Sequence, residues 1–380
     1  MRREDNEKLQ QPYSVATPIN ERFAEALGVK LPALRELHRE VFADFDERAR
    51  GIGWWAPHPG TSRRILISDH LLMCIASIQT NLIEARLHLL ELGDFNEQED
   101  AIIAHAVTHD RQGRPSVKMP ERDKPADDLP HHMAALHIAG FFRAVGSALD
   151  CLGAGIVGVL ALPTSILKTD MLTAIGAFKK LKTSATGATK LQATFGANLT
   201  QLIASAGPPG WLRWATDYRN MLVHRGRRLQ LALLQPRGAP LEMPDGSRVM
   251  LARSVLQLAR DPGLSDIEAL HLTKTTAPVL TEDATTTLEG VMASVLELTE
   301  KTAATLVEIW RRRRTEPALL VQPKEQWPRG CSSASRGFGG YKPGTVPFNI
   351  DWLVSNPMFV ERLKVAALDT GARKKWDTFD

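Results

Sequence analysis

Long amphipathic segments are the feature that most constrains the fold of this chain. Between residues 65 and 92, apolar side chains recur at steps of three and four residues, which is the period of one helix face. This face consists of Leu66, Leu71, Leu72, Ile75, Ile78, Leu82, Ile83, Leu87 and Leu90. The pattern predicts a helix over 65–92, with Gly93 as its C-cap. So long an apolar stripe must pack against others, which favours a helical bundle.

Further segments show the same period. We expect helices over residues 130–162, 165–182, 191–206, 211–225 and 281–314, and shorter ones over 20–27 and 31–47. The last long helix starts with Thr281, followed by Glu282 and Asp283 in its first turn. Residues 110–130 are rich in proline and charge and predict a loop.

The pattern changes after Gly226. Short, partly alternating runs around a Pro244-Asp245-Gly246 turn predict a β-hairpin insertion at about 229–252. Residues 255–260 and 266–273 are expected to form short helical turns. The predicted fold class is therefore all-α: a helical bundle with a small β-hairpin insertion and irregular N- and C-terminal extensions. The expected domains are an N-terminal extension at 1–61, the bundle at 62–315 and a Pro/Gly-rich tail at 316–380.

Composition narrows the class of protein further. Hydrophobic residues make up 43% and charged residues 24% of the chain, which excludes collagen-like, fully disordered and disulfide-scaffold proteins. Cys74 and Cys151 lie in apolar helical stretches, so we expect buried free thiols. The apolar run at 151–163 is shorter than the about 20 residues that span a bilayer, and no signal-peptide pattern is present. We therefore expect a cytoplasmic protein that does not contact a membrane.

Positive charge is concentrated in two places. Residues 211–228 hold Arg213, Arg219, Arg225, Arg227 and Arg228 against a single acid, Asp217. Residues 311–314 are four consecutive arginines. Two interpretations apply to this second cluster: a solvated helix end, which the helix dipole favours, or a surface for an anionic partner.

The segment 211–226 carries an ordered polar stripe. At 100° per residue, Trp211, Trp214, Tyr218, Met221 and Leu222 share the face expected to point into the core. Arg213, Asp217, Asn220 and His224 share the opposite face, and Arg219 lies on the flank between the two. Gly226 is expected to end the helix just after the histidine.

This spacing resembles the HEPN family, whose signature is an arginine and a histidine four to six residues apart, often written RNxxVH. Here the motif is Arg219-Asn220-Met221-Leu222-Val223-His224. The resemblance covers residues 62–315 and implies a HEPN-like helical bundle with the motif near the end of a late helix. Some family members carry a modifiable tyrosine two residues after the histidine; this chain has Gly226 there, so we expect that regulation to be absent.

The resemblance implies a metal-independent endoribonuclease, a toxin or antiviral effector, that needs no cofactor. Arg219, Asn220 and His224 are then the catalytic residues, and Arg213, Arg225, Arg227 and Arg228 contact the RNA. It further implies a homodimer with a composite site, and an antitoxin or defence-system protein as a partner. These residue types suit the cleavage of RNA. RNA supplies its own 2′-OH nucleophile, histidine titrates near neutrality, and arginine matches phosphate oxygens.

Other interpretations remain open. The arginine, asparagine and histidine could cap the helix end and bind Asp217. A HEPN-like bundle could hold RNA or a nucleotide without cleaving it, or serve as a scaffold. His105 and His109 are four residues apart, as in helical metal sites, but no third ligand is evident, so we expect no metal. His131, His132 and His137 are expected to be solvated caps at a helix start. Trp54 and Trp55 are expected to pin a loop to the domain rather than to stack on bases.

Overall fold

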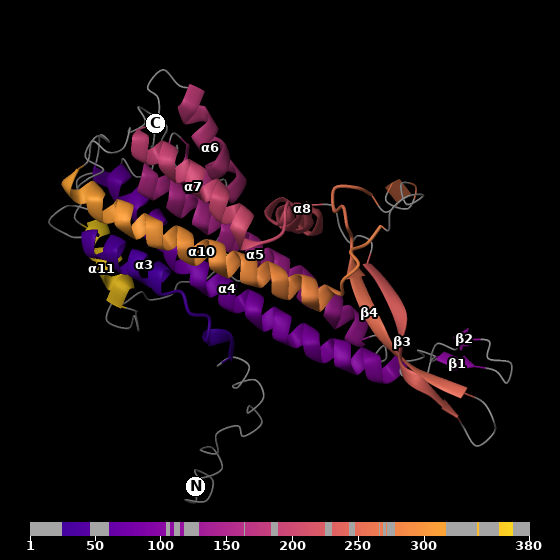
Figure 1. Ribbon diagram of the computed structural model, residues 1–380. Coiled ribbons are helices and arrows are strands. Elements are labelled where there is room, and N and C mark those ends of the chain that lie inside the picture. The colour runs from indigo at the N-terminus through magenta and orange to yellow at the C-terminus, as the bar shows by residue number, and fades with distance from the viewer. Residues whose placement is uncertain are drawn as a thin grey trace, which may run out of the picture. The chain divides into compact units, whose positions relative to one another are not determined.

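The protein is predominantly helical, as predicted (Figure 1). The computed structural model describes residues 25–45, 61–103, 107–109, 115–117, 129–162, 164–183, 189–224, 230–242, 248–265, 267–268, 271, 278–316, 340–341 and 357–367. The predictions for Trp54, Trp55, His105 and the 20–24 part of the first short helix lie outside these residues.

The predicted helices are present with shifted ends. The helices are α3 (Pro32–Asp44), α4 (Thr61–Ile103), α5 (Leu129–Leu160), α6 (Met171–Thr183), α7 (Lys190–Ala206), α8 (Trp211–His224), α10 (Ala284–Thr315) and α11 (Pro357–Ala367). Aspartate side chains cap the starts of α6 and α10. The backbone N–H groups of Thr173 and Thr286 donate to the side chains of Asp170 and Asp283, at 2.6 Å and 2.8 Å. Asp283 therefore caps α10, which begins at Ala284 and not at Thr281 as predicted.

The chain divides into two compact units. Unit 1 comprises Met1–Lys30, Gln79–Ala148 and Ile203–Glu297, and unit 2 comprises Leu31–Ile78, Leu149–Leu202 and Leu298–Asp380. Each unit is built from three separated stretches, so α4, α5, α7 and α10 contribute part of their length to each. The predicted domain boundaries at residues 61 and 315 do not coincide with the boundaries of these two units, and they stay predictions.

Unit 1 contains α8, parts of α4, α5, α7 and α10, and a four-stranded antiparallel sheet. The strands are β1 (Val107–His109), β2 (Pro115–Val117), β3 (Gln230–Glu242) and β4 (Arg248–Leu258), in the order β2-β1-β4-β3. The predicted hairpin is confirmed as β3 and β4. The helical turn predicted at 255–260 is wrong, because β3 pairs with β4 as far as Gln230 opposite Leu258. The loop predicted at 110–130 is wrong for residues 115–117, because these residues form β2 and pair with β1.

Two predicted helix ends are also wrong. Gly93 does not end its helix: α4 continues to Ile103. Beyond the glycine, the ring of Phe95 stacks on His137 at 5.4 Å between centroids, and the Asn96 amide donates to the Thr285 hydroxyl at 3.0 Å. These contacts with α5 and α10 stabilise the helix beyond Gly93. The apolar periodicity of the sequence does not reveal them. Similarly, the helix predicted from residue 165 begins at Met171, after a short 3₁₀ turn over Ile166–Lys168.

The C-terminal extension is not wholly irregular. The helix α11 lies in the segment predicted as a Pro/Gly-rich tail, within unit 2. Val365 of α11 is buried with Phe45 and Ile65, and the guanidinium of Arg362 forms an ion pair with Asp69. Among the described side chains of α11, Val365 and Arg362 make these docking contacts, and so short a segment is too little pattern to be recognised from sequence.

Helix α5 is the most apolar element. By length and composition, its His131–Leu160 portion could cross a membrane, with a mean hydropathy of 1.4 over the most apolar window. The run at 151–163, predicted to be too short for this, is thus part of a longer apolar helix. However, 78% of that window is buried inside the protein, as in the core helix of a soluble protein.

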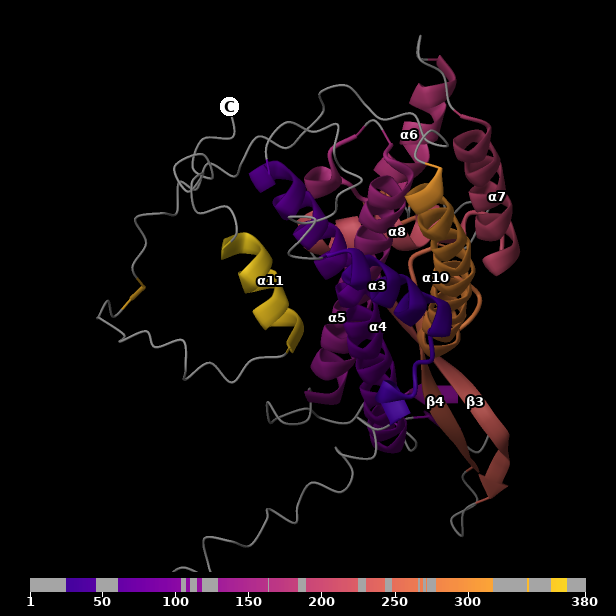
Figure 2. The same cartoon turned by 90° about the vertical axis from the view of Figure 1, so that its left-hand side faces the viewer.

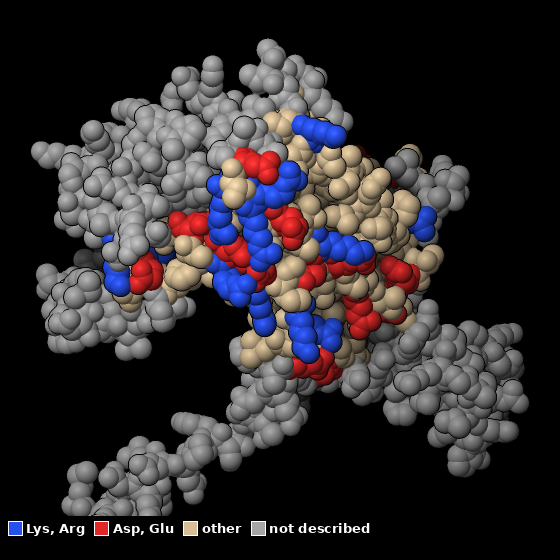
Figure 3. Space-filling view, turned by 60° about the vertical axis from the view of Figure 1, so that its left-hand side comes forward, with Lys and Arg blue, Asp and Glu red and all other residues tan. Residues whose placement is uncertain are grey.

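In unit 2, the arginine cluster at the end of α10 is neither a free solvated end nor an open cationic patch. Arg311 and Arg314 donate to Glu40 of α3 at 2.8 Å and 2.6 Å, and Arg314 also donates to Asp44. Burial raises the pKa of Glu40, but the hydrogen bonds from the two arginines outweigh it and lower that pKa. Both ribbon views place α3 beside this end of α10 (Figures 1 and 2). The space-filling view shows positively and negatively charged side chains interleaved on this side of the molecule (Figure 3). The acids of α3 largely neutralise the cluster.

Arg313 has a different role from its neighbours. Its side chain is 1% exposed, and Nη1 donates to the carbonyl oxygens of Gly158 and Val159 at 3.1 Å and 2.5 Å. These carbonyls belong to the last turn of α5, where intrahelical donors run out, although the Gly158 carbonyl also accepts the backbone N–H of Ala161 at 3.4 Å. A buried cation therefore caps the negative end of the α5 dipole.

We expect Arg313→Ala to destabilise the protein by about 2–4 kcal/mol, because two buried carbonyls lose a charged donor and a cavity opens. The matched control is Arg312→Ala, whose side chain is 52% exposed and lies 4.0 Å from Glu316. That change should stay within about 0.5 kcal/mol. Urea unfolding of both variants measures the difference, and equal midpoints would contradict the capping role.

Candidate functional site

A glycine-proline turn sets the start of α8. Gly210 has a φ of +85°, a left-handed conformation that glycine adopts without strain. Its carbonyl accepts the backbone N–H of Trp214 at 2.9 Å, which begins the helical hydrogen bonding directly after the turn. The position of this turn fixes the rotation of α8 and hence the direction of every side chain on it.

Aromatic side chains anchor α8 to α5, as the predicted core face requires. The ring of Tyr218 stacks on Phe142 of α5 with centroids 4.4 Å apart, and Trp214 meets the same ring edge-on at 5.7 Å. The Trp214 indole also donates to the carbonyl of Ala259, just after β4, at 3.2 Å. Trp211, Tyr218 and Met221 are buried, whereas Trp214 is half-buried. Two elements of unit 1 therefore hold the helix in place.

Arg213 and Asp217 pair on the outer face of α8. The Arg213 Nε donates to the Asp217 carboxylate at 2.7 Å, and the arginine side chain is 70% exposed. Exposed pairs at this spacing contribute about 0.3–0.5 kcal/mol and exchange readily with solvent. Arg213 is thus accessible to an anion, although one carboxylate already compensates its charge.

Arg219 and Asn220 form the best-defined part of the motif. The Arg219 Nη1 donates to the Asn220 side-chain oxygen at 3.0 Å. A guanidinium only donates, so it orients the amide oxygen toward itself and leaves the Asn220 NH₂ group to donate elsewhere. Both side chains are half-buried.

Gly146 of α5 provides the space for Arg219. A Cβ atom at this position would lie 2.8 Å from Cγ and 3.0 Å from Nε of Arg219. Any larger residue would therefore collide with the stem of the arginine. Phe142, one turn earlier on α5, holds Tyr218 by stacking. Consecutive turns of α5 thus position consecutive residues of α8.

His224 is the last residue of α8. Its backbone is described but its side chain is not, and Arg225, Arg227 and Arg228 lie outside the described residues. The structure therefore brings Arg213, Asp217, Arg219 and Asn220 together on one helix that ends at the motif histidine. The roles predicted for all of these residues stay predictions.

A histidine pair elsewhere in unit 1 was not predicted. His88 of α4 and His137 of α5 share a hydrogen bond between their Nδ1 atoms at 3.0 Å. Burial lowers the pKa of both imidazoles, and His88 further lowers that of His137. Because the rings are neutral, one can donate and the other accept.

The expectation that His137 is a solvated cap is therefore wrong. His131 and His132 are exposed at the start of α5, but His137 lies further along and contacts α4. The sequence feature that indicates this contact is Gly140, one turn after His137. A Cβ atom at this position would lie 2.3 Å from the His88 ring. A glycine on a helix face can mark a bulky partner on its neighbour.

No metal centre is seen in the described part of the chain: no three His, Cys, Asp or Glu residues there are grouped to hold an ion. His109 lies in β1, so the helical four-residue spacing from His105 does not apply to it.

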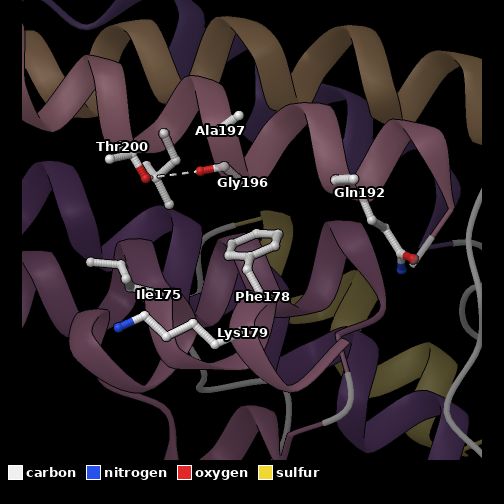
Figure 4. Close-up of a pocket in the computed structure, with 9 residues that line it drawn as sticks. Ile175, Phe178, Lys179, Gln192, Gly196, Ala197 and Thr200 are labelled. Carbon is white, nitrogen blue, oxygen red and sulfur yellow. Dashed lines mark hydrogen bonds between the residues drawn. The ribbon is translucent and has the colours of Figure 1, made fainter. Parts of the chain in front are cut away.

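Two hollows lie among the described residues of unit 2, and no residue of α8 lines either of them. One lies between α6 and α7, has a volume of about 150 Å³, and contains Phe178, Lys179 and Gln192 (Figure 4). The Phe178 ring enters it, and the Gln192 amide donates to the Leu160 carbonyl at 2.8 Å. The other lies between α7 and α10, with Arg312 on its wall, and has a volume of about 430 Å³. The first is smaller than usual small-molecule sites of about 300–1,000 Å³, and the second is an open groove.

Comparison with known proteins gives no family assignment: no family model, no curated protein and no solved structure matches this chain. The residues of α8 and their surroundings therefore remain the features of this chain that indicate a function.

Proposed function

We propose that the protein is a metal-independent endoribonuclease of the HEPN type whose active site is the C-terminal half of α8. His224 transfers the proton, Arg219 neutralises charge on the scissile phosphate, and Asn220 donates a hydrogen bond to the phosphate or to His224. Arg213, Arg225, Arg227 and Arg228 contact the RNA backbone.

The main support for this proposal is that contacts on two sides fix the position of the Arg219 side chain. Its stem lies over Gly146, and its guanidinium is hydrogen-bonded to Asn220, the next residue of the motif. A preorganised guanidinium stabilises developing negative charge without having to reorganise in the transition state. The long apolar helices and the late position of α8 agree with a HEPN-like layout.

We further propose a homodimer in which two α8 helices complete one site. Arg219 and His224 are five residues apart, which separates their directions by about 140° on a helix. One helix therefore does not aim both groups at one phosphate, whereas the arginine of one chain can serve the histidine of another. Val223, beside the histidine, is 46% exposed and supplies apolar surface. Sedimentation equilibrium at tens of micromolar should give a dimer, and a strict monomer would exclude the composite site.

Gly146→Ala tests the placement of Arg219. The new methyl group must displace the arginine stem, and a shift of about 1 Å in a catalytic group costs up to about 10²-fold in rate. We expect RNA cleavage to fall at least about tenfold. Gly290→Ala, in the same unit and with open space around the position, is the control and should leave the rate unchanged. Equal rates for the two variants would show that the position of Arg219 does not matter.

The proposal as a whole is tested with a labelled RNA and the full-length protein. Wild-type protein should cut the RNA in excess EDTA as fast as without it, because the proposed chemistry uses only side chains and the 2′-OH. Loss of cleavage in EDTA, restored by a divalent ion, would contradict the mechanism. RNA that is bound but not cut would favour the second candidate, a module that binds RNA without cleaving it.

A further inference from the structure

Two thiols of unit 2 meet where α4 packs on α5. The side chains of Cys74 of α4 and Cys151 of α5 are neighbours that interact with each other. The helices approach closely because glycines of α5 face α4. A Cβ at Gly158 would lie 2.7 Å from Leu71, and one at Gly155 would lie 3.9 Å from Ile75. Cys74 lies between Leu71 and Ile75 along this face, so close packing of the helices brings its thiol to Cys151.

A histidine completes the group. The His70 Nε2 lies 3.4 Å from the Cys74 Sγ, one helical turn away. The ring also hydrogen-bonds to the backbone of Ile166, and burial lowers its pKa. The ring is therefore neutral, and an N–H donated to the Ile166 carbonyl leaves the other nitrogen as a proton acceptor beside Cys74.

The two thiols are not equivalent. The hydrogen bond from Cys74 lowers the pKa of Cys151, against the effects of burial and of Asp150, which raise it. The same contact raises the pKa of Cys74. Cys151 is therefore the thiol that ionises more readily, and Cys74 is its neighbour. Both residues are half-buried rather than buried as predicted, so each keeps some solvent-accessible surface.

We propose that Cys74 and Cys151 are an oxidant-sensitive modification site that a peroxide converts into a reversible disulfide. The Cys151 thiolate attacks one peroxide oxygen, the O–O bond breaks, and Cys151 becomes a sulfenic acid as hydroxide leaves. Cys74 then gives its proton to His70 and attacks the Cys151 sulfur, and the S–O bond breaks to release water. In total, two thiols and one hydrogen peroxide give one disulfide and two waters, with two electrons passing to the peroxide.

The test uses the full chain carrying Cys331→Ser, so that Cys74 and Cys151 are its only thiols. Stoichiometric hydrogen peroxide should reduce the number of alkylatable thiols from two to none, and dithiothreitol should restore both. Mass spectrometry should find the peptides of Cys74 and Cys151 joined, in a monomeric chain on non-reducing gels. The oxidised form should melt about 5 °C higher, because the new bond closes a long loop.

Variants separate the two steps. Cys74→Ser should stop at a sulfenic acid on Cys151, which dimedone traps, and His70→Gln should slow disulfide formation at least about tenfold. Two thiols that stay free in peroxide would overturn the proposal. Conversion of Cys151 to a sulfinic acid in the Cys331→Ser chain, or disulfides only between chains, would also overturn it.

Discussion

Replacing His224 with alanine is expected to reduce RNA cleavage by about 10²–10⁴-fold, the usual contribution of a general acid or base. His224 is the only histidine in residues 211–228, and histidine is the side-chain type suited to proton transfer near neutral pH. Without it, the 2′-OH loses its proton only to water. Initial rates on one labelled RNA measure the effect.

The control for His224 is His131→Ala. His131 is an exposed histidine at the start of α5, in the same unit. Its removal lowers the histidine content equally and should leave cleavage unchanged. Circular dichroism of both variants checks that the helices persist. If His224→Ala cleaves like wild type, the histidine only ends the helix and the active site lies elsewhere.

Arg219→Ala is expected to cost about 10²–10³-fold in cleavage, as the loss of one transition-state donor does. Arg219→Lys should recover only part of the rate, because an ammonium group cannot form the two parallel hydrogen bonds that a guanidinium offers to phosphate. Arg39→Ala is the control: this arginine is 73% exposed and pairs only with Glu36 among the described residues.

A purely structural role for Arg219 makes a different prediction. Arg219 contacts Gly146 and Asn220, so its removal could act through stability. In that case, cleavage by Arg219→Ala should fall only in proportion to the unfolded fraction, and lowering the temperature should restore it. A rate that stays low in fully folded protein indicates a catalytic role.

Sequence periodicity was sufficient for the long helices because their apolar faces are buried along most of their length. The anchoring of α8 was also predictable, since Trp211 and Tyr218 recur at helical spacing and are buried. The β3–β4 hairpin was predictable from its turn residues. These features depend on local chemistry, which a single sequence displays.

Features that depend on partners distant in sequence were not predictable. Arg313 is one of four identical neighbours, and only the end of α5 distinguishes it by offering two carbonyls. The strands β1 and β2 are three residues each and exist through pairing with each other and with β4. The contact between Arg219 and Gly146 joins residues 73 positions apart, so the spacing within the motif did not reveal it.

The chemistry of the RNA ends distinguishes attack by the 2′-OH from attack by water. Attack by the 2′-OH leaves a 2′,3′-cyclic phosphate on one fragment and a 5′-OH on the other, and mass spectrometry of the fragments distinguishes these ends from a 3′-OH and a 5′-phosphate. We predict cyclic phosphate ends with wild-type protein in EDTA, and none above background with His224→Ala. Fragments with 3′-OH and 5′-phosphate ends would show that water attacks the phosphate, which would contradict a ribonuclease site built from Arg219, Asn220 and His224.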